Sequence, residues 1–109
     1  MDEKQALDML GALSQETRLR IVRYLVQCGT EGAPAGDIGK QVGATSSRAS
    51  FHLSALENAG AISSERRSRN IIYRADFEKI GGLMSFLLND CCRDHPHIRA
   101  CCDLENECC

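Results

Sequence analysis

Apolar residues recur every three or four positions along most of the chain, which predicts a mainly helical domain. The repeat defines a first helix in residues 4–13 and a second helix that ends near Cys28. In the second helix the apolar stripe consists of Leu19, Val22, Leu25 and Val26. Ser14 precedes this helix in the position of an N-cap. A loop by composition then leads to a short third helix in residues 35–42, which Gly43 ends.

The fourth predicted helix has an apolar inward face and a polar outward face. Thr45 or Ser46 caps its start and Gly60 ends it. The inward face consists of Ala49, Leu53, Leu56 and Ala59. Because the tight turn at residues 43–45 joins it to the third helix, the pair is a candidate helix-turn-helix.

A hairpin and a further helix follow. Residues 61–66 and 70–74 predict two short strands, the second rich in isoleucine and tyrosine, with Arg67, Ser68 and Arg69 as the connection. From Asp76 another helix carries more apolar residues than one stripe needs. The surplus consists of Leu83, Met84, Phe86 and Leu87. A chain of 109 residues has little else to cover them, so we expect a partner subunit to do so.

Composition agrees with one globular domain, since 43% of the residues are hydrophobic and 26% are charged. No run of about 18 apolar residues is present, so we expect no membrane span. The charged first residues lack a following apolar segment, which predicts no signal peptide and a cytoplasmic protein. We expect a DNA-binding and dimerisation domain in residues 1–92 and a cysteine-rich tail in residues 93–109.

The slightly negative net charge of −2 conceals two regions of opposite sign. Residues 46–75 hold five arginines and two glutamates, a net charge of +3. Residues 89–109 hold two arginines and five acidic residues, a net charge of −3. Binding to nucleic acid would therefore depend on a local basic face rather than on the overall charge.

Short polar and cationic side chains at the start of the fourth helix suit entry into the major groove of DNA. The candidate DNA contacts are Ser46, Ser47, Arg48, Ser50 and His52 in the helix and Arg67 and Arg69 at the hairpin tip. Each also has an ordinary structural interpretation, because serines cap helices and surface arginines are commonly solvated. His52 suits a structural hydrogen bond as well as a phosphate contact. Phe51 points outward and is either a thymine-methyl contact or an unusual exposure.

Three blocks of sequence resemble the ArsR/SmtB family of metal-responsive repressors. They are residues 12–21, residues 50–60 and residues 69–74. The resemblance extends from residue 5 to about residue 92 and implies a mainly α (α+β) winged helix-turn-helix fold, with about five helices plus a two-stranded wing. It implies a homodimer that pairs through its first and last helices and represses by binding double-stranded operator DNA. It places the helix candidates above in the recognition helix and both arginines in the wing.

The family senses its inducers at several places, and two of them are missing here. The familiar thiolate box lies in the helix before the recognition helix, and residues 35–42 contain no cysteine. The familiar zinc site needs histidine on the last helix, and residues 76–88 contain none. The remaining candidates gather at the C-terminal end: Cys91, Cys92, Cys101 and Cys102. Thiolates select soft ions, and the arrangement is similar to that of arsenical repressors with a C-terminal cysteine site.

We therefore predict that As(III) or Sb(III) binds Cys91, Cys92 and Cys101, with Cys102 exchangeable for Cys101, and releases the repressor from DNA. Two alternatives keep the DNA binding and change the signal. Zinc or cadmium could use cysteine and histidine ligands, or the thiols could oxidise to disulfides. A further alternative is that the cysteines of the tail have no function.

The remaining cysteines do not indicate an enzyme. Cys28 is expected to be a small buried apolar side chain. Cys108 and Cys109 are either frayed or spare thiols. A thiol enzyme of the common kind would show Cys-x-x-Cys near a βαβ pattern, and the chain has neither, so we expect no enzyme.

Overall fold

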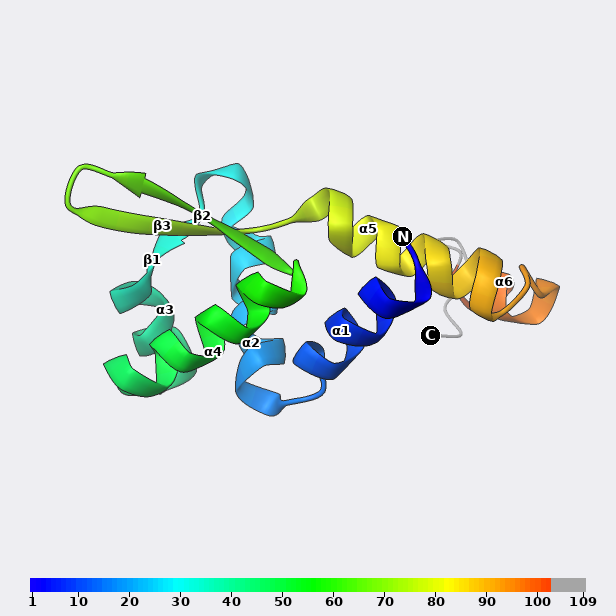
Figure 1. Ribbon diagram of the computed structural model, residues 1–109, viewed down its shortest axis with the longest axis horizontal. Coiled ribbons are helices and arrows are strands. Elements are labelled where there is room, and N and C mark those ends of the chain that lie inside the picture. The colour runs from blue at the N-terminus through cyan, green and yellow to red at the C-terminus, as the bar shows by residue number, and fades with distance from the viewer. Residues whose placement is uncertain (103–109) are drawn as a thin grey trace.

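Four helices form the body of the protein, in the order that the apolar repeats predict (Figure 1). They are α1 (Glu3–Leu13), α2 (Glu16–Cys28), α3 (Ala35–Val42) and α4 (Ser46–Ala59). The computed structural model describes residues 1–102; Cys108 and Cys109 lie outside the described residues. No helix in residues 1–102 is both long enough and apolar enough to cross a bilayer.

The helix ends follow local rules, with one correction to the prediction. Ser14 does not cap α2; its hydroxyl donates to the Gly11 carbonyl at 2.8 Å and so ends α1. Gln15 caps α2 instead, because its side-chain oxygen accepts from the Arg18 N–H at 2.9 Å. Thr45 rather than Ser46 caps α4.

A small antiparallel sheet covers one end of the helical body. It consists of β1 (Ala33–Pro34), β2 (Ile62–Arg67) and β3 (Asn70–Ala75), in the spatial order β1-β3-β2. The two long strands confirm the predicted wing hairpin. The strand β1 corrects the prediction of a loop at this place, because Ala33 pairs with Tyr73 and Pro34 with Ile72. The fold is thus a mainly helical winged helix-turn-helix with six α-helices and three strands in residues 1–102.

The last predicted helix is divided into three parts. The helix α5 (Phe77–Phe86) continues into a π-helical turn (Leu87–Cys91), and a separate helix α6 (Pro96–Cys101) follows. Arg93 and Asp94 both have positive φ angles, 51° and 53°, which reverse the chain between the two helices. In Figure 1, α5 leads away from the body and α6 lies at the far end from the hairpin.

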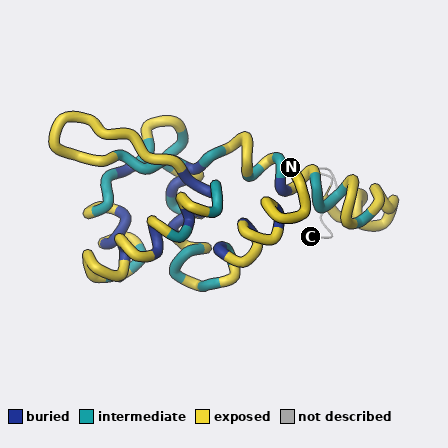
Figure 2. Tube along the Cα trace, viewed as in Figure 1, coloured by how far each residue is buried: buried dark blue, intermediate teal, exposed yellow. Residues whose placement is uncertain are grey.

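The core lies where α1–α4 meet the start of the hairpin. Its largest fully buried side chains are Met9, Ile21, Leu25, Ile38, Leu53, Leu56 and Leu83. Only Leu83 of this set comes from α5, so the other residues of that helix lie outside the fully buried part of the core. The hairpin tip and α6 are exposed, as Figure 2 shows.

Candidate nucleic-acid interface

The start of α4 is an exposed polar surface. Ser46, Ser47, Arg48 and Ser50 are all exposed, whereas Ala49 between them is buried against the core. The Thr45 hydroxyl accepts from the Arg48 N–H at 3.3 Å, which fixes the first turn. The N-terminal end of α4 and the tip of the hairpin lie on the same side of the molecule, opposite α5 and α6 (Figure 1). We call this side the reading side.

The wing carries its cations unevenly. The Glu65 carboxylate lies 2.8 Å from Nη1 of Arg74 and 3.4 Å from Nε of Arg67. Arg74 is half-buried and also donates to the Thr30 carbonyl at 2.7 Å, so it fastens the base of the wing. Arg67 and Arg69, the predicted wing contacts, are both exposed near the tip. Their placement suits contact with a polyanion, and the contact itself stays a prediction.

His52 differs from the other predicted contacts because it is buried, with 7% of its surface exposed. Its Nδ1 accepts a hydrogen bond from Nε of Arg18 at 3.1 Å. Burial, together with the nearby charges of Arg18 and Arg48, lowers the pKa of His52 below its ordinary value. The structural hydrogen bond is therefore present, and a phosphate contact by His52 stays a prediction.

Arg18 is a residue that the sequence pattern did not single out. It lies in the first turn of α2, 34 positions before its partner His52, and no local pattern reports so distant a contact. Its guanidinium carbon also lies 5.7 Å from the centre of the Phe51 ring. One side chain of α2 thus contacts two consecutive residues of α4.

The predicted inducer thiols lie at the end of the π-helical turn and around α6. Cys91, Cys101 and Cys102 are exposed and Cys92 is half-buried. Arg99 of α6 donates to the Asn89 side chain at 2.8 Å and pairs with Asp94, so α6 folds back toward the π-helical turn.

Cys92 interacts with two of the other predicted ligands, Cys91 and Cys102. Burial, the hydrogen-bonded neighbour Cys91 and the more remote Cys102 raise the pKa of Cys92. Within residues 1–102 no three side chains of histidine, cysteine, aspartate or glutamate are close enough to share a metal ion. The predicted ligands therefore lie in one region without forming a ready-made ion site.

The remaining predicted metal or core residues have local partners. His95 caps α6 by accepting at Nδ1 from the His97 N–H at 3.2 Å, and the two imidazole rings stack edge to face. Cys28 is half-buried and packs against the core, where the prediction was full burial. Its hydrogen bond with Tyr24 raises the pKa of that phenol.

An apolar groove of about 330 Å³ lies between α1 and the end of α5. Its lining includes Leu7, Leu10, Phe86 and Leu87, and Leu7 is 60% exposed. Cys91 also lines the groove, so one predicted inducer thiol borders this apolar surface.

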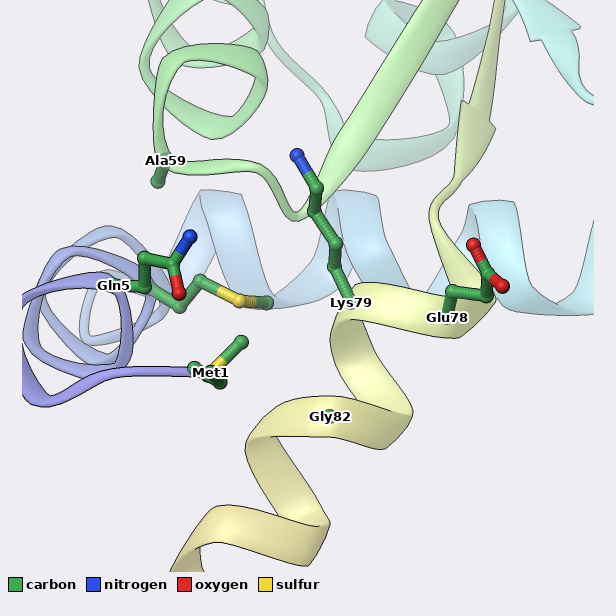
Figure 3. Close-up of a pocket in the computed structure, with 7 residues that line it drawn as sticks. Met1, Gln5, Ala59, Glu78, Lys79 and Gly82 are labelled. Atoms are coloured by element: carbon green, nitrogen blue, oxygen red, sulfur yellow. The ribbon is translucent and has the colours of Figure 1, made fainter.

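A second cavity, of about 260 Å³, lies where the start of α1, the end of α4 and α5 meet. Figure 3 shows Gln5 and Lys79 reaching toward it, with Gly82 on the α5 side. A Cβ atom at Gly60 would lie 3.1 Å from Cδ of Lys79, so the lysine stem packs over the C-terminal cap of α4. The helix α5 thus contacts the ends of α1 and α4 partly through long side chains such as Lys79.

The comparisons with known proteins agree with this geometry. A family model described as a helix-turn-helix domain matches residues 13–65. The HTH-type transcriptional regulator YgaV of Escherichia coli (strain K12) is 32% identical over 89 residues, which cover 82% of this chain and 88% of that protein.

Two solved structures share the fold. An ArsR-like transcriptional regulator from Rhodococcus sp. RHA1 superposes with a TM-score of 0.73 at 24% identity, covering 89% of each chain. The homodimeric winged helix-turn-helix DNA-binding domain Mb0332 from Mycobacterium bovis gives a TM-score of 0.64 at 24% identity, covering 84% of this chain and 85% of that one.

Proposed function

The chain belongs to the HTH-type transcriptional regulators, which bind DNA and are not enzymes, and it shares the winged helix-turn-helix fold of an ArsR-like regulator. We therefore propose that it is a homodimeric repressor of the ArsR family whose operator binding is controlled by C-terminal thiols. The observation that carries the proposal of operator binding is the reading side, where the exposed polar start of α4 and the arginines of the hairpin tip lie at the same end of the molecule.

Operator binding follows from the shape and charge of the reading side. The serines at the start of α4 are short, so the backbone of the helix can approach base edges in the major groove. Arg48 and the wing arginines Arg67 and Arg69 supply positive charge beside it for phosphate contacts. Two such surfaces related by a two-fold axis would bind an inverted repeat.

Dimerisation follows from the apolar groove between α1 and α5. Exposed apolar side chains such as Leu7 and Leu10 are stabilised when they are buried in an interface. In a two-fold dimer the same helices of a second copy would pack against them. The relative Mb0332 is described as homodimeric, which supports this assignment. The dimer would bury the groove and set the distance between its two reading sides.

The position of Cys91 on the groove supports control by thiols. The thiols of Cys91, Cys92 and either Cys101 or Cys102 suit a soft trivalent ion such as As(III) or Sb(III). Each thiol that binds arsenite replaces one hydroxyl and releases one water. Joining these residues requires α6 to move against the π-helical turn, and that movement changes the edge of the dimer groove. Coupling of about 1–3 kcal/mol would weaken operator binding roughly 5- to 150-fold.

A second candidate signal is oxidation of the same thiols, since Cys91 and Cys92 are hydrogen-bonded neighbours. The raised pKa of Cys92 disfavours its thiolate, which is the form that reacts with oxidants and also the form that binds soft ions, so the titrations below decide between the two signals. Zinc or cadmium is a third signal, one that would use His95 or His97 beside the thiols.

The test is release of labelled DNA from the full chain, measured by fluorescence anisotropy on the DNA that precedes its own gene. Arsenite, antimonite, zinc, cadmium and hydrogen peroxide are added in separate titrations. Release at one equivalent of arsenite or antimonite per protomer supports the proposal. Release by peroxide alone, or by zinc and cadmium alone, assigns the signal to the corresponding alternative.

Serine variants assign the ligands. Cys91→Ser and Cys92→Ser are expected to abolish release while leaving DNA affinity unchanged, and Cys28→Ser is the matched control outside the cluster. If Cys101→Ser and Cys102→Ser each respond like wild type but the double variant does not, the two cysteines are exchangeable. A normal response from Cys91→Ser would refute the site.

A further inference from the structure

The outward face of α4 carries an aromatic ring, and the DNA contacts proposed for the serines and arginines do not explain why it is there. Phe51 is 64% exposed, the highest value among the large apolar side chains exposed in residues 1–102. It follows Ser47 by four positions and precedes Ser54 and Ala55 by three and four, so these residues lie next to it on the helix surface. These three neighbours are short, so the ring projects beyond them, and the fourth neighbour on the helix surface is the exposed Arg48, three positions before Phe51.

The Phe51 ring is held in place although it is exposed. It meets the imidazole of His52 edge to face, with ring centres 5.5 Å apart and planes at 69°. The guanidinium of Arg18 supplies a second contact, 5.7 Å from the ring centre, within the range of a cation–π interaction. These two contacts restrict the orientation of the ring.

Arg18 is in turn fixed by the buried imidazole. The bond from Nε of Arg18 to Nδ1 of His52 requires His52 to be unprotonated at that nitrogen. The burial of His52 and the positive charges of Arg18 and Arg48 all favour the neutral ring. Arg18, His52 and Phe51 thus form one connected set that joins α2 to the outward face of α4; we call it the Phe51 clamp.

We propose that Phe51 contacts the 5-methyl group of a thymine in each operator half-site, and that Arg18 is the positioning residue that aims its ring. The thymine methyl is the one apolar group that a base pair presents in the major groove, and an aromatic ring is a suitable partner for it. The short neighbours of Phe51 let the ring approach the base edges. The inference rests on the proposed operator binding and adds a specificity-determining residue to it.

The test removes the methyl group without changing any hydrogen bond. The full chain first selects its preferred site from a random duplex library, and the selected duplexes identify the operator. Each thymine of the selected site is then replaced by deoxyuridine, in one half-site and in both. Affinities are measured by anisotropy at one fixed salt concentration, because salt changes all DNA affinities strongly.

We expect one symmetric thymine position at which loss of the methyl weakens binding by wild type about fourfold per half-site, the value for burying one methyl-sized group. Substitution in both half-sites should weaken binding roughly 15-fold, because the two contacts are independent. Phe51→Ala should bind the thymine and deoxyuridine duplexes equally. Phe77→Ala, which removes another exposed phenylalanine from α5, should discriminate as wild type does.

The role of Arg18 is tested by the same ratio of affinities. Arg18→Lys keeps the positive charge but lacks the planar guanidinium and its Nε donor. We expect it to lose discrimination between thymine and deoxyuridine while circular dichroism and affinity for the deoxyuridine duplex stay near wild type. Full discrimination by this variant would refute the positioning role.

The outcomes distinguish failure of operator binding from failure of the thymine contact. If wild type selects no DNA site, the proposed operator binding is wrong. If wild type selects a site but no deoxyuridine substitution weakens the binding, the operator binding stands and the thymine contact is wrong. The same conclusion follows if Phe51→Ala discriminates between thymine and deoxyuridine as strongly as wild type.

Discussion

Replacing Gly32 by alanine tests how β1 holds the wing. Gly32 has a φ of 68° and a ψ of −161°, a backbone region open essentially to glycine alone. A Cβ atom there would lie 2.3 Å from the Tyr73 carbonyl oxygen and 2.7 Å from Cγ of Arg74. The first neighbour is backbone of β3 and cannot move without displacing the strand.

The cost of Gly32→Ala has two parts that the structure separates. Forcing alanine into this backbone region costs about 1–3 kcal/mol. Relieving the overlap with β3 costs a further 1–3 kcal/mol or so, as overpacking does elsewhere. We therefore expect the free energy of unfolding to fall by about 2–6 kcal/mol, measured by urea denaturation followed by circular dichroism.

Two other glycines supply matched controls. Gly29 has a similar backbone conformation, with φ 65° and ψ −144°, but its Cβ would meet nothing within 4 Å. Gly29→Ala should therefore cost only the backbone part, about 1–3 kcal/mol. Gly36 lies in α3 with open space around its Cβ position, so Gly36→Ala should stabilise by about 0.5–1 kcal/mol. Equal losses for Gly32→Ala and Gly29→Ala would refute the contact with β3 as a source of destabilisation.

Three further predictions concern the core, the dimer and pH. Leu56→Ala, at a position with no exposed surface, should lower the free energy of unfolding by about 2–5 kcal/mol in urea denaturation, and a loss below about 1 kcal/mol would contradict its place in the core. Leu7→Asp should shift the dimer to monomer in analytical ultracentrifugation while leaving the helical signal intact, because it places a charge on the apolar groove; an unchanged dimer would exclude that groove as the interface. The lowered pKa of His52 means that the unfolded chain binds a proton more readily than the folded one, so this contribution to stability is complete above the unfolded pKa of about 6.5 and is lost as the pH falls toward the folded value. His52→Gln should flatten that part of the stability–pH profile, and an unaltered profile would show that His52 does not cause it.

The helical body could be predicted from the sequence because its signals are local. The apolar repeats of α2 and α4 and the glycines at their ends all act within a few residues of the helix they define. Gly43 and Gly60 have the left-handed conformations that their predicted roles as C-caps require. The bounds of the wing strands could be predicted to within one residue for the same reason.

Two of the missed features depend on partners distant in sequence. β1 contains only Ala33 and Pro34 and becomes a strand through pairing with β3, some 40 positions later. The bond between Arg18 and His52 spans 34 positions, so the periodicity of either helix alone could not show it. The fold-back of α6 depends on the reversal at Arg93 and Asp94, two non-glycine residues with positive φ that composition does not signal.

Glu65 has a consequence for how the protein searches a genome. The Glu65 carboxylate pairs with Arg74 at the base of the wing and with Arg67 nearer its tip. Part of the positive charge of the wing is therefore neutralised within the protein. A phosphate that takes Arg67 must compete with Glu65, which weakens the attraction of the wing to arbitrary DNA. Weaker sequence-independent attraction shortens each stay at a wrong site. Under the proposed function, such a wing would leave recognition to α4 and would let the protein sample more DNA sites per unit time while it searches for its operator.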